Sequence, residues 1–314
     1  MLLVDRVIRS RPAPSADAVA SSDGAFLVQF HNAKLVTPAG LVAGDLWMQG
    51  GAIVDPQARF WQRRRAAADH RIDCQGMLLA PGMIDVMLHG AFGVDFSSLG
   101  EAGAAAEAEA AAALALVRRR LPELGVTTFC PAVRASSPEA SARLIARLGP
   151  TTTVQPTETK GALAHCAGVH LDGPFADAEQ GAAALEAAGH GATARHLRSS
   201  LSGDALHEAY GGRATNAALI TLAPELPGAV EVVEALTAAG VVVGIGRTSA
   251  TLAQCRAAAQ AGARLVSHLM SAMPPFVCVP PSSNAPRECP AAVPVNAPLP
   301  VNAPLGEPLP PTQV

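Results

Sequence analysis

The stretch Met83-Ile84-Asp85-Val86-Met87-Leu88-His89-Gly90 is a short apolar run that closes on a histidine and a glycine. It follows Pro81-Gly82, and beyond it short apolar runs alternate with longer segments rich in Ala and Leu. This alternation is typical of βα units that build a parallel sheet. Six such runs predict strands at Met83–Leu88, Val126–Pro131, Gly168–Leu171, Ala217–Leu222, Val241–Ile245 and Arg264–His268.

The segments between these runs contain many good helix formers. They predict helices at Glu101–Leu121, Pro138–Arg147, Ala229–Ala239 and Leu252–Ala261. A closed (β/α) barrel needs eight βα units. The predicted fold class is therefore α/β, with an incomplete (β/α) barrel of about six of the eight units.

Upstream of the barrel, strand-like runs surround a Gly50-Gly51 turn and predict a small, partial β-sandwich domain on the N-terminal side. The expected strands are Phe26–Phe30, Lys34–Val36, Asp45–Met48 and Ala52–Val54. We expect a disordered extension over residues 1–25, the β-domain over 26–78, a truncated barrel over 79–276 and a Pro-rich tail over 277–314. The tail has eleven prolines in 38 residues, a composition that favours extended chain without sheet pairing.

Composition excludes several classes of partner. The net charge of -3 and the pI near 6.3 leave no continuous basic surface, so we expect no nucleic-acid partner. The most apolar stretch, Ala104–Val117, is interrupted by two glutamates, and we expect no membrane span. Six cysteines at irregular spacings predict reduced, mostly buried thiols and neither a disulfide framework nor a zinc knuckle. A cytoplasmic location is the resulting expectation.

Polar side chains stand at the ends of several predicted strands. His89 follows the first strand, Asp172 the third and His268 the sixth. In a (β/α) barrel the carboxyl ends of the strands share one rim, so these three side chains are expected to converge. A lone histidine at a strand end more often serves the structure, and the prediction therefore depends on the three together. Two imidazoles and a carboxylate suit zinc or a similar divalent ion with one position open for water.

Five motifs follow one another along the chain. They are Leu79-Ala80-Pro81-Gly82-Met83-Ile84-Asp85-Val86, Gly125-Val126-Thr127-Thr128-Phe129-Cys130-Pro131, His170-Leu171-Asp172-Gly173-Pro174-Phe175, Thr221-Leu222-Ala223-Pro224-Glu225 and His268-Leu269-Met270-Ser271-Ala272-Met273. In this order and spacing they resemble the N-acetylglucosamine-6-phosphate deacetylase family of the amidohydrolase superfamily. The segment from Gly44 to Pro56 is similar to the small β-domain of that family. The resemblance runs roughly from Phe30 to Phe276.

The resemblance implies a metal-dependent-hydrolase barrel and one divalent metal ion, zinc or similar. It implies hydrolysis of the acetamide of an amino-sugar phosphate, N-acetylglucosamine 6-phosphate, by a metal-activated water, with release of acetate and glucosamine 6-phosphate. The family often builds its site with a residue from a partner subunit, which implies a homodimer.

Carried over residue by residue, the resemblance assigns the metal to Asp172 and His268, with His89 as a further candidate. Asp172 stands where the family has the Glu of Glu-Gly-Pro. Arg247 stands where the family has the His of Gly-His-Ser, and a guanidinium has no lone pair to give a metal. Met87 replaces the first His of a His-x-His pair, so a second metal is not expected.

The resemblance also assigns residues that bind the substrate. Ser271 replaces an expected Asn and stands beside a retained Ala272. An expected Gly-Ala-His reads Gly191-Ala192-Thr193, with His190 and His196 as candidate substitutes. The Asp-Gly-x-His segment and the Thr-Asp-Ala segment, whose Asp handles the proton in the family, belong beyond Phe276, so no catalytic residue is assigned and poor turnover or none is expected.

Three alternatives remain open from the sequence. In the first, the chain is a degenerate, non-catalytic family member in which Arg247 pairs with Asp172, because such a charge-assisted bond satisfies a buried carboxylate. In the second, the chain is an incomplete gene model. In the third, it is another amidohydrolase of the dihydroorotase-like kind, which Met87 disfavours because the first strand of such an enzyme needs a His-x-His pair.

Overall fold

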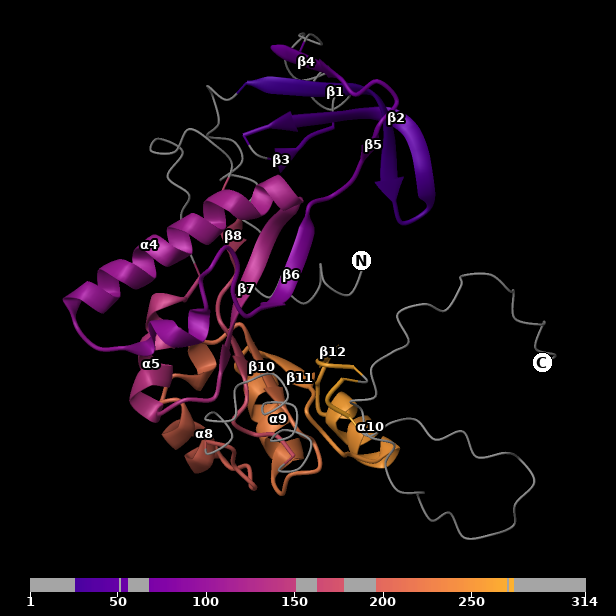
Figure 1. Ribbon diagram of the computed structural model, residues 1–314. Coiled ribbons are helices and arrows are strands. Elements are labelled where there is room, and N and C mark those ends of the chain that lie inside the picture. The colour runs from indigo at the N-terminus through magenta and orange to yellow at the C-terminus, as the bar shows by residue number, and fades with distance from the viewer. Residues whose placement is uncertain are drawn as a thin grey trace, which may run out of the picture.

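Two sheets organise the chain in a computed structural model, which describes residues 26–50, 52–55, 68–150, 163–177, 196–269 and 271–273. A five-stranded sheet precedes a seven-stranded one, and the short strand β5 leads from the first to the second (Figure 1). The extension expected over 1–25 and the tail expected over 277–314 lie outside the described residues.

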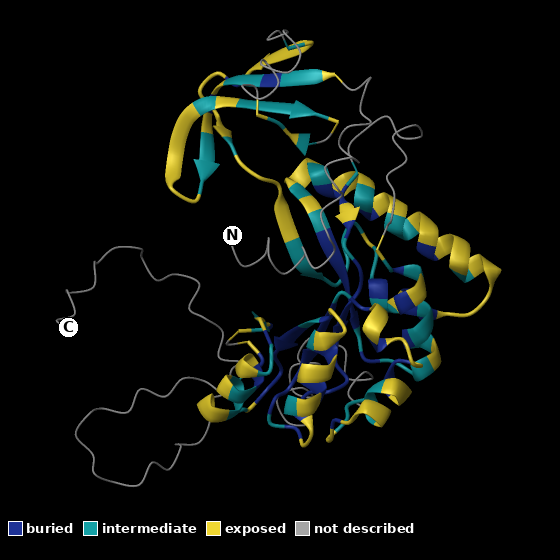
Figure 2. Ribbon diagram, turned by 180° about the vertical axis from the view of Figure 1, so that it is seen from behind, coloured by how far each residue is buried: buried dark blue, intermediate teal, exposed yellow. Residues whose placement is uncertain are grey.

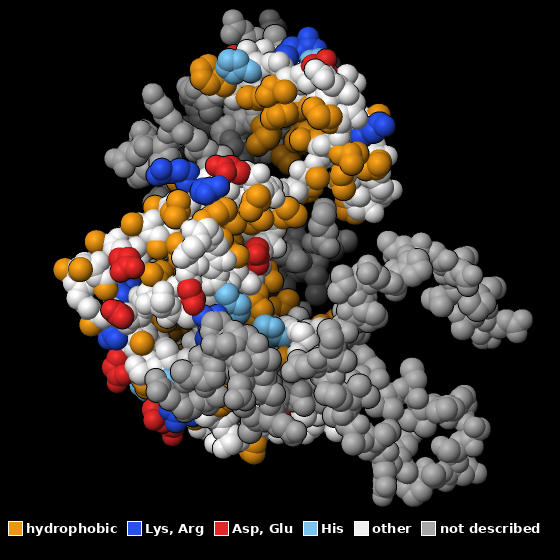
Figure 3. Space-filling model, in the orientation of Figure 1, with side chains coloured by type: hydrophobic (Ala, Val, Ile, Leu, Met, Phe, Trp, Pro, Cys, Tyr) orange, Lys and Arg blue, Asp and Glu red, His pale blue; other side chains and the backbone are white. Residues whose placement is uncertain are grey.

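The small sheet has the strand order β3-β2-β1-β4, with β5 also paired to β1. Its strands are β1 (Leu27–Thr37), β2 (Gly40–Gln49), β3 (Ala52–Ile53), β4 (His70–Asp73) and β5 (Leu78–Leu79). Where two strands were predicted, the structure has the single strand β1. A bulge between Phe30 and Ala33 accommodates the residues that interrupt the sequence pattern, so the strand continues through them. Hydrophobic side chains gather over this sheet (Figure 3), and Leu41, Ile53 and Leu78 are exposed.

The large sheet has the strand order β12-β11-β10-β9-β7-β6, with β8 beside β7, and every pairing is parallel. Its strands are β6 (Met83–Leu88), β7 (Val126–Arg134), β8 (His165–Cys166), β9 (His170–Asp172), β10 (Leu219–Leu222), β11 (Val242–Ile245) and β12 (Leu265–Val266). All six predicted strands are therefore confirmed. The strand β8 was not predicted, since two residues are too few for a periodic signal.

Local sequence signals fix where the helices start. The helices are α4 (Ala104–Arg120), α5 (Pro138–Arg147), α8 (Gly203–Ala209), α9 (Ala229–Ala238) and α10 (Leu252–Gln260), with short 3₁₀ turns η1 (Phe96–Gly100), η2 (Leu121–Leu124) and η3 (Ala214–Asn216). Ser137 caps α5 by accepting a hydrogen bond from the backbone N–H of Ala140, and Pro138 follows as the first helical residue. Thr251 and Gln254 form a capping box at α10. The four predicted helices are confirmed.

The core lies between the large sheet and the helices on its outer face. Figure 2 shows the buried strands behind helices whose outer faces are exposed. Strands β9 and β10 are buried at every residue, as expected for parallel strands that are covered on both sides. The rings of Phe96 and Phe129 stack in this core with centroids 6.2 Å apart. Of the described cysteines, three are buried and none is in a disulfide, as the sequence predicts.

The large sheet is curled, because side chains that follow its two edge strands lie close together. Six strands laid flat would separate the edges β6 and β12 by five spacings of about 4.8 Å, or about 24 Å. Yet His89 and His268, which follow these edges, have ring centroids only 6.5 Å apart. Both edges are open, since Met83 on β6 and Val266 on β12 are more than half exposed. The sheet is thus an open part of a (β/α) barrel, and β6 and β12, its two edges in the described residues, are not paired with each other.

No helix in the part of the chain that the structure describes combines the length and the apolar character needed to cross a membrane.

Candidate metal centre

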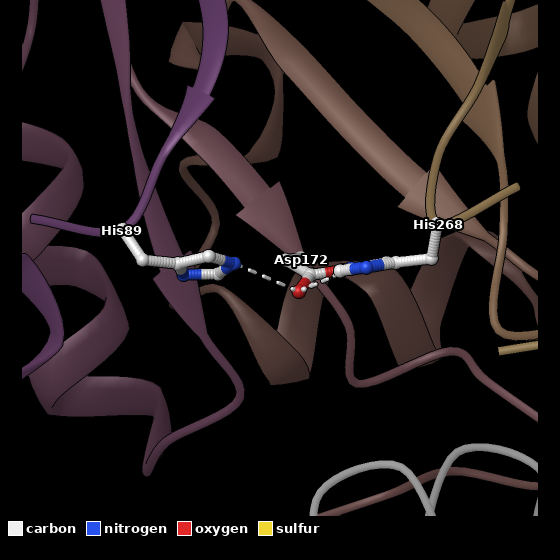
Figure 4. Close-up of side chains that lie close together, drawn as sticks. All are labelled: His89, Asp172 and His268. Atoms are coloured by element: carbon white, nitrogen blue, oxygen red, sulfur yellow. Dashed lines mark hydrogen bonds and ion pairs between the residues drawn. The ribbon is translucent and has the colours of Figure 1, made fainter. Parts of the chain in front are cut away.

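Three predicted side chains converge at the carboxyl rim of the barrel (Figure 4). His89 directly follows β6, Asp172 is the last residue of β9, and His268 lies two residues beyond β12. The Nε2 atom of His89 is 3.4 Å from Oδ2 of Asp172, and the Nε2 atom of His268 is 3.2 Å from the same oxygen. One ligand atom from each of the three residues lies within 4.8 Å of the others. The geometry therefore brings together the cluster that strand order alone predicted.

A fourth side chain, that of Arg247, binds the carboxylate of Asp172. Its Nη2 donates to Oδ2 of Asp172 at 2.7 Å and its Nε donates to Oδ1 at 3.1 Å, which makes a two-pronged ion pair. The Asp172 side chain is 0% exposed and the Arg247 side chain 8%, so water does not screen the pair. The contact between Arg247 and Asp172 that the sequence suggested is confirmed.

The ionisation of Asp172 follows from these contacts. Burial by itself would raise the pKa of the carboxyl group. Hydrogen bonds from His268, His89 and Arg247 and the charge of Arg247 outweigh burial, and the pKa of Asp172 lies well below its ordinary value. The side chain is therefore a carboxylate at neutral pH, the form that can bind a cation.

The loops that carry Arg247 and His268 adopt unusual backbone conformations. Arg247 has φ +52° and His268 has φ +53°, in the left-handed region that side chains with a Cβ seldom occupy. Between the two loops the chain packs tightly, since a Cβ on Gly246 would lie 2.8 Å from the carbonyl oxygen of Ser267. Strain of this kind persists only where the surrounding contacts hold it, and it often marks a functional site.

A buried hydrogen-bond chain supports the rim and links β6, β9 and β10 to Ser267, the residue after β12. His170 Nδ1 lies 2.8 Å from the carbonyl oxygen of Val86, and its Nε2 lies 2.7 Å from Oγ1 of Thr221, which in turn contacts Oγ of Ser267 at 2.8 Å. A carbonyl oxygen only accepts, so Nδ1 carries the proton. Burial lowers the pKa of His170, so the ring is neutral and Nε2 accepts from the Thr221 hydroxyl. Sequence reasoning did not find this chain.

The spacing of the ligand atoms of His89, Asp172 and His268 can be compared with the spacing of ligands around a divalent ion. Ligand atoms about 2.1 Å from a tetrahedral zinc ion lie about 3.4 Å apart. The two nitrogen-to-oxygen distances of 3.4 and 3.2 Å match that separation, and imidazole nitrogen and carboxylate oxygen are common zinc ligands. The Nδ1 atom of His89 is buried with no hydrogen-bond partner among the described residues. The residues therefore fit an ion, with Arg247 as the one group in the cluster that cannot ligate it.

Of the remaining predicted site residues, the structure describes Ser271, Ala272 and His196. Ser271 donates its hydroxyl to the carbonyl of His268 at 3.2 Å, and Ala272 is buried with its carbonyl oxygen 3.2 Å from the backbone nitrogen of Thr248. His196 lines a cavity of about 200 Å³ together with Ser136, Pro174 and Arg198. His190 lies outside the described residues.

Comparisons with known proteins agree with this fold. No family model matches the chain. It is 40% identical to N-acetylglucosamine-6-phosphate deacetylase from Mus musculus over 255 residues, which are 81% of this chain and 57% of the mouse protein. The Homo sapiens protein of the same name is 40% identical over 258 residues, with the same shares covered. The chain thus spans just over half the length of these curated relatives.

Solved structures of deacetylases of the same name also resemble this chain. A mutant of N-acetyl-D-glucosamine-6-phosphate deacetylase from Mycobacterium smegmatis, in complex with N-acetyl-D-glucosamine-6-phosphate, matches with a TM-score of 0.54 at 25% identity. The match covers 80% of this chain and 57% of that one. The deacetylase from Pasteurella multocida matches in fold with a TM-score of 0.57 at 23% identity, over 80% of this chain and 58% of that one.

Proposed function

We propose that this chain, which is homologous to N-acetylglucosamine-6-phosphate deacetylases, acts in the hydrolysis of the acetamide of N-acetylglucosamine 6-phosphate. The products are glucosamine 6-phosphate and acetate. The reaction needs a strong nucleophile at neutral pH, because an amide carbonyl resists attack by water. A divalent ion supplies that chemistry when bound, by lowering the pKa of water and polarising the carbonyl.

The observation that supports this proposal best is the convergence of His89, Asp172 and His268 at one rim. We assign the ion to these three residues. Asp172 brings the negative charge that offsets the ion, and the two imidazoles bring neutral lone pairs. Their exposures of 30% and 22% leave the histidines open on the outer side of the cluster, where a substrate acetamide can approach.

The other assignments are part of the same proposal. Ser271, Ala272 and His196 border the substrate, with His190 as a further candidate. We assign the small β-domain to residues 26–78 and the barrel to residues 79–276. We place the protein in the cytoplasm, where sugar phosphates are available, and expect a homodimer.

Acetate release tests the proposal directly. We expect the purified 314-residue protein to release acetate from N-acetylglucosamine 6-phosphate when zinc is supplied. A chelator, or the substitution His268→Ala, is expected to lower the rate about tenfold or more, because each removes part of the ion site. A coupled acetate assay measures the rate.

His207→Ala is the matched control, since His207 is an exposed histidine on α8 and should leave the rate unchanged. A rate that is insensitive to the chelator and to His268→Ala would contradict the metal-dependent reaction. Absence of acetate at every zinc concentration would contradict the hydrolysis itself.

A second candidate function is favoured by one observation, the bond of Arg247 to both oxygens of Asp172. A carboxylate already neutralised by an internal cation needs no metal. In that case the chain binds an amino-sugar phosphate without chemistry. Isothermal titration with N-acetylglucosamine 6-phosphate in the presence of a chelator separates the two, since only a non-catalytic binder keeps its full affinity for the sugar and forms no acetate.

A further inference from the structure

We propose that Arg247 is a built-in competitor of the divalent ion: its guanidinium holds the Asp172 carboxylate, and an ion enters only when that side chain withdraws. The inference rests on the metal site proposed above and concerns what regulates its occupancy. It predicts a fold that is stable without metal and an ion affinity that is set by one residue outside the ligand set.

The contacts at Asp172 leave little room for an additional cation. Oδ2 already faces three donors, Nη2 of Arg247 at 2.7 Å, Nε2 of His268 at 3.2 Å and Nε2 of His89 at 3.4 Å. Oδ1 accepts from Nε of Arg247 at 3.1 Å. The shortest contact is thus the one to the guanidinium. An ion that uses Oδ2 has to replace it.

Charge reinforces this competition. The Asp172 side chain is fully buried and needs a counter-charge, which Arg247 provides permanently, since a guanidinium does not lose its proton in a protein. With Arg247 in place, a dication between the two histidines would lie beside a fixed positive charge in a weakly screened environment. Ion binding is therefore an exchange of one cation for another.

The backbone around Arg247 is fixed, so only the side chain can withdraw. The carbonyl oxygen of Arg247 accepts from the backbone N–H of Asp177 at 2.9 Å. On either side, Gly246 donates to Leu222 and Thr248 donates to Ala272. These bonds tie the loop to the last residue of β10 and to the segments that follow β9 and β12. The exchange thus amounts to a rotamer change of one long side chain, which leaves the rim in place.

Zinc affinity and thermal stability of Arg247→Gln test the proposal. Gln keeps hydrogen-bond donors but removes the charge. We expect Arg247→Gln to bind zinc about tenfold or more tightly than the wild-type protein, because the ion then neutralises an otherwise unpaired carboxylate. Its Tm should be lower than that of the wild-type protein in a chelator and should rise with zinc, whereas the wild-type Tm should move little.

Two further variants sharpen the result. Arg247→His offers an imidazole lone pair and is expected to bind zinc more tightly than Arg247→Gln. Arg134→Gln is the matched control, since Arg134 is also a largely buried arginine at a strand end, paired with Asp95 outside the cluster. Its zinc affinity should equal that of the wild-type protein. If Arg247→Gln does not fold, Arg247→Lys keeps a charge without the two-pronged bond and should still gain affinity.

Competition with a chromophoric chelator measures the affinities. Equal zinc affinities in the wild-type, Arg247→Gln and Arg247→His proteins would overturn the inference and leave the proposed metal site intact. A lack of zinc binding in all three would instead overturn the metal site and, with it, the proposed reaction. A lower affinity in Arg247→Gln would also overturn the inference, because it would make Arg247 a supporting residue.

Discussion

The substitution Asp172→Ala is expected to lower the free energy of unfolding by about 3 to 5 kcal/mol. It removes the only charge that faces Arg247 in the cluster, and Arg247 is left as a buried, unpaired cation. It also removes the group that joins His89, at one edge of the sheet, to His268, at the other. Urea unfolding in the presence of a chelator measures the loss.

The double substitution Asp172→Ala with Arg247→Ala provides the control. It removes both charges together, so the protein should recover part of the stability lost in Asp172→Ala. Strictly additive losses from the two single substitutions would mean that the two side chains do not interact in solution, contrary to their contacts at 2.7 and 3.1 Å.

His170→Ala should destabilise the protein by a similar amount, about 3 to 5 kcal/mol. The imidazole is fully buried and bonds to the Val86 carbonyl and to the Thr221 hydroxyl. Its loss leaves both partners without their bond and opens a cavity beneath the rim. Because these bonds join β6, β9 and β10, the loss should also displace Asp172, two residues along β9.

Thermal or urea unfolding measures this effect as well, with His207→Ala as an exposed histidine that should change stability by no more than about 0.5 kcal/mol. A loss below about 1 kcal/mol in His170→Ala would contradict the account of the buried hydrogen-bond chain.

Much of the fold could be predicted from short-range sequence signals. Apolar runs between Gly and Pro located six of the seven strands of the large sheet, and Pro138–Arg147 was predicted with the bounds that α5 has. The strand β8, with two residues, and the helix α8, with seven, were missed because neither stands in a run long enough to give a periodic pattern. In β1 a bulge continues a strand that the sequence pattern seemed to end.

The site could be predicted in part, and for a physical reason. Because carboxyl ends of parallel strands meet at one rim, the positions of His89, Asp172 and His268 in sequence were enough to bring them together. The role of His170 could not be predicted in this way. A core histidine and a metal ligand look alike in sequence, and the partners of His170 lie on strands far along the chain.

The central claim is that His89, Asp172 and His268 form a site for a divalent ion. An anomalous difference map at the zinc edge, from crystals equilibrated in excess zinc, tests it most directly. The account predicts one peak between the Nε2 atoms of His89 and His268 and the Oδ2 atom of Asp172, with the Arg247 side chain moved away from the carboxylate. A map with no peak there, while the guanidinium still holds Asp172, would contradict it.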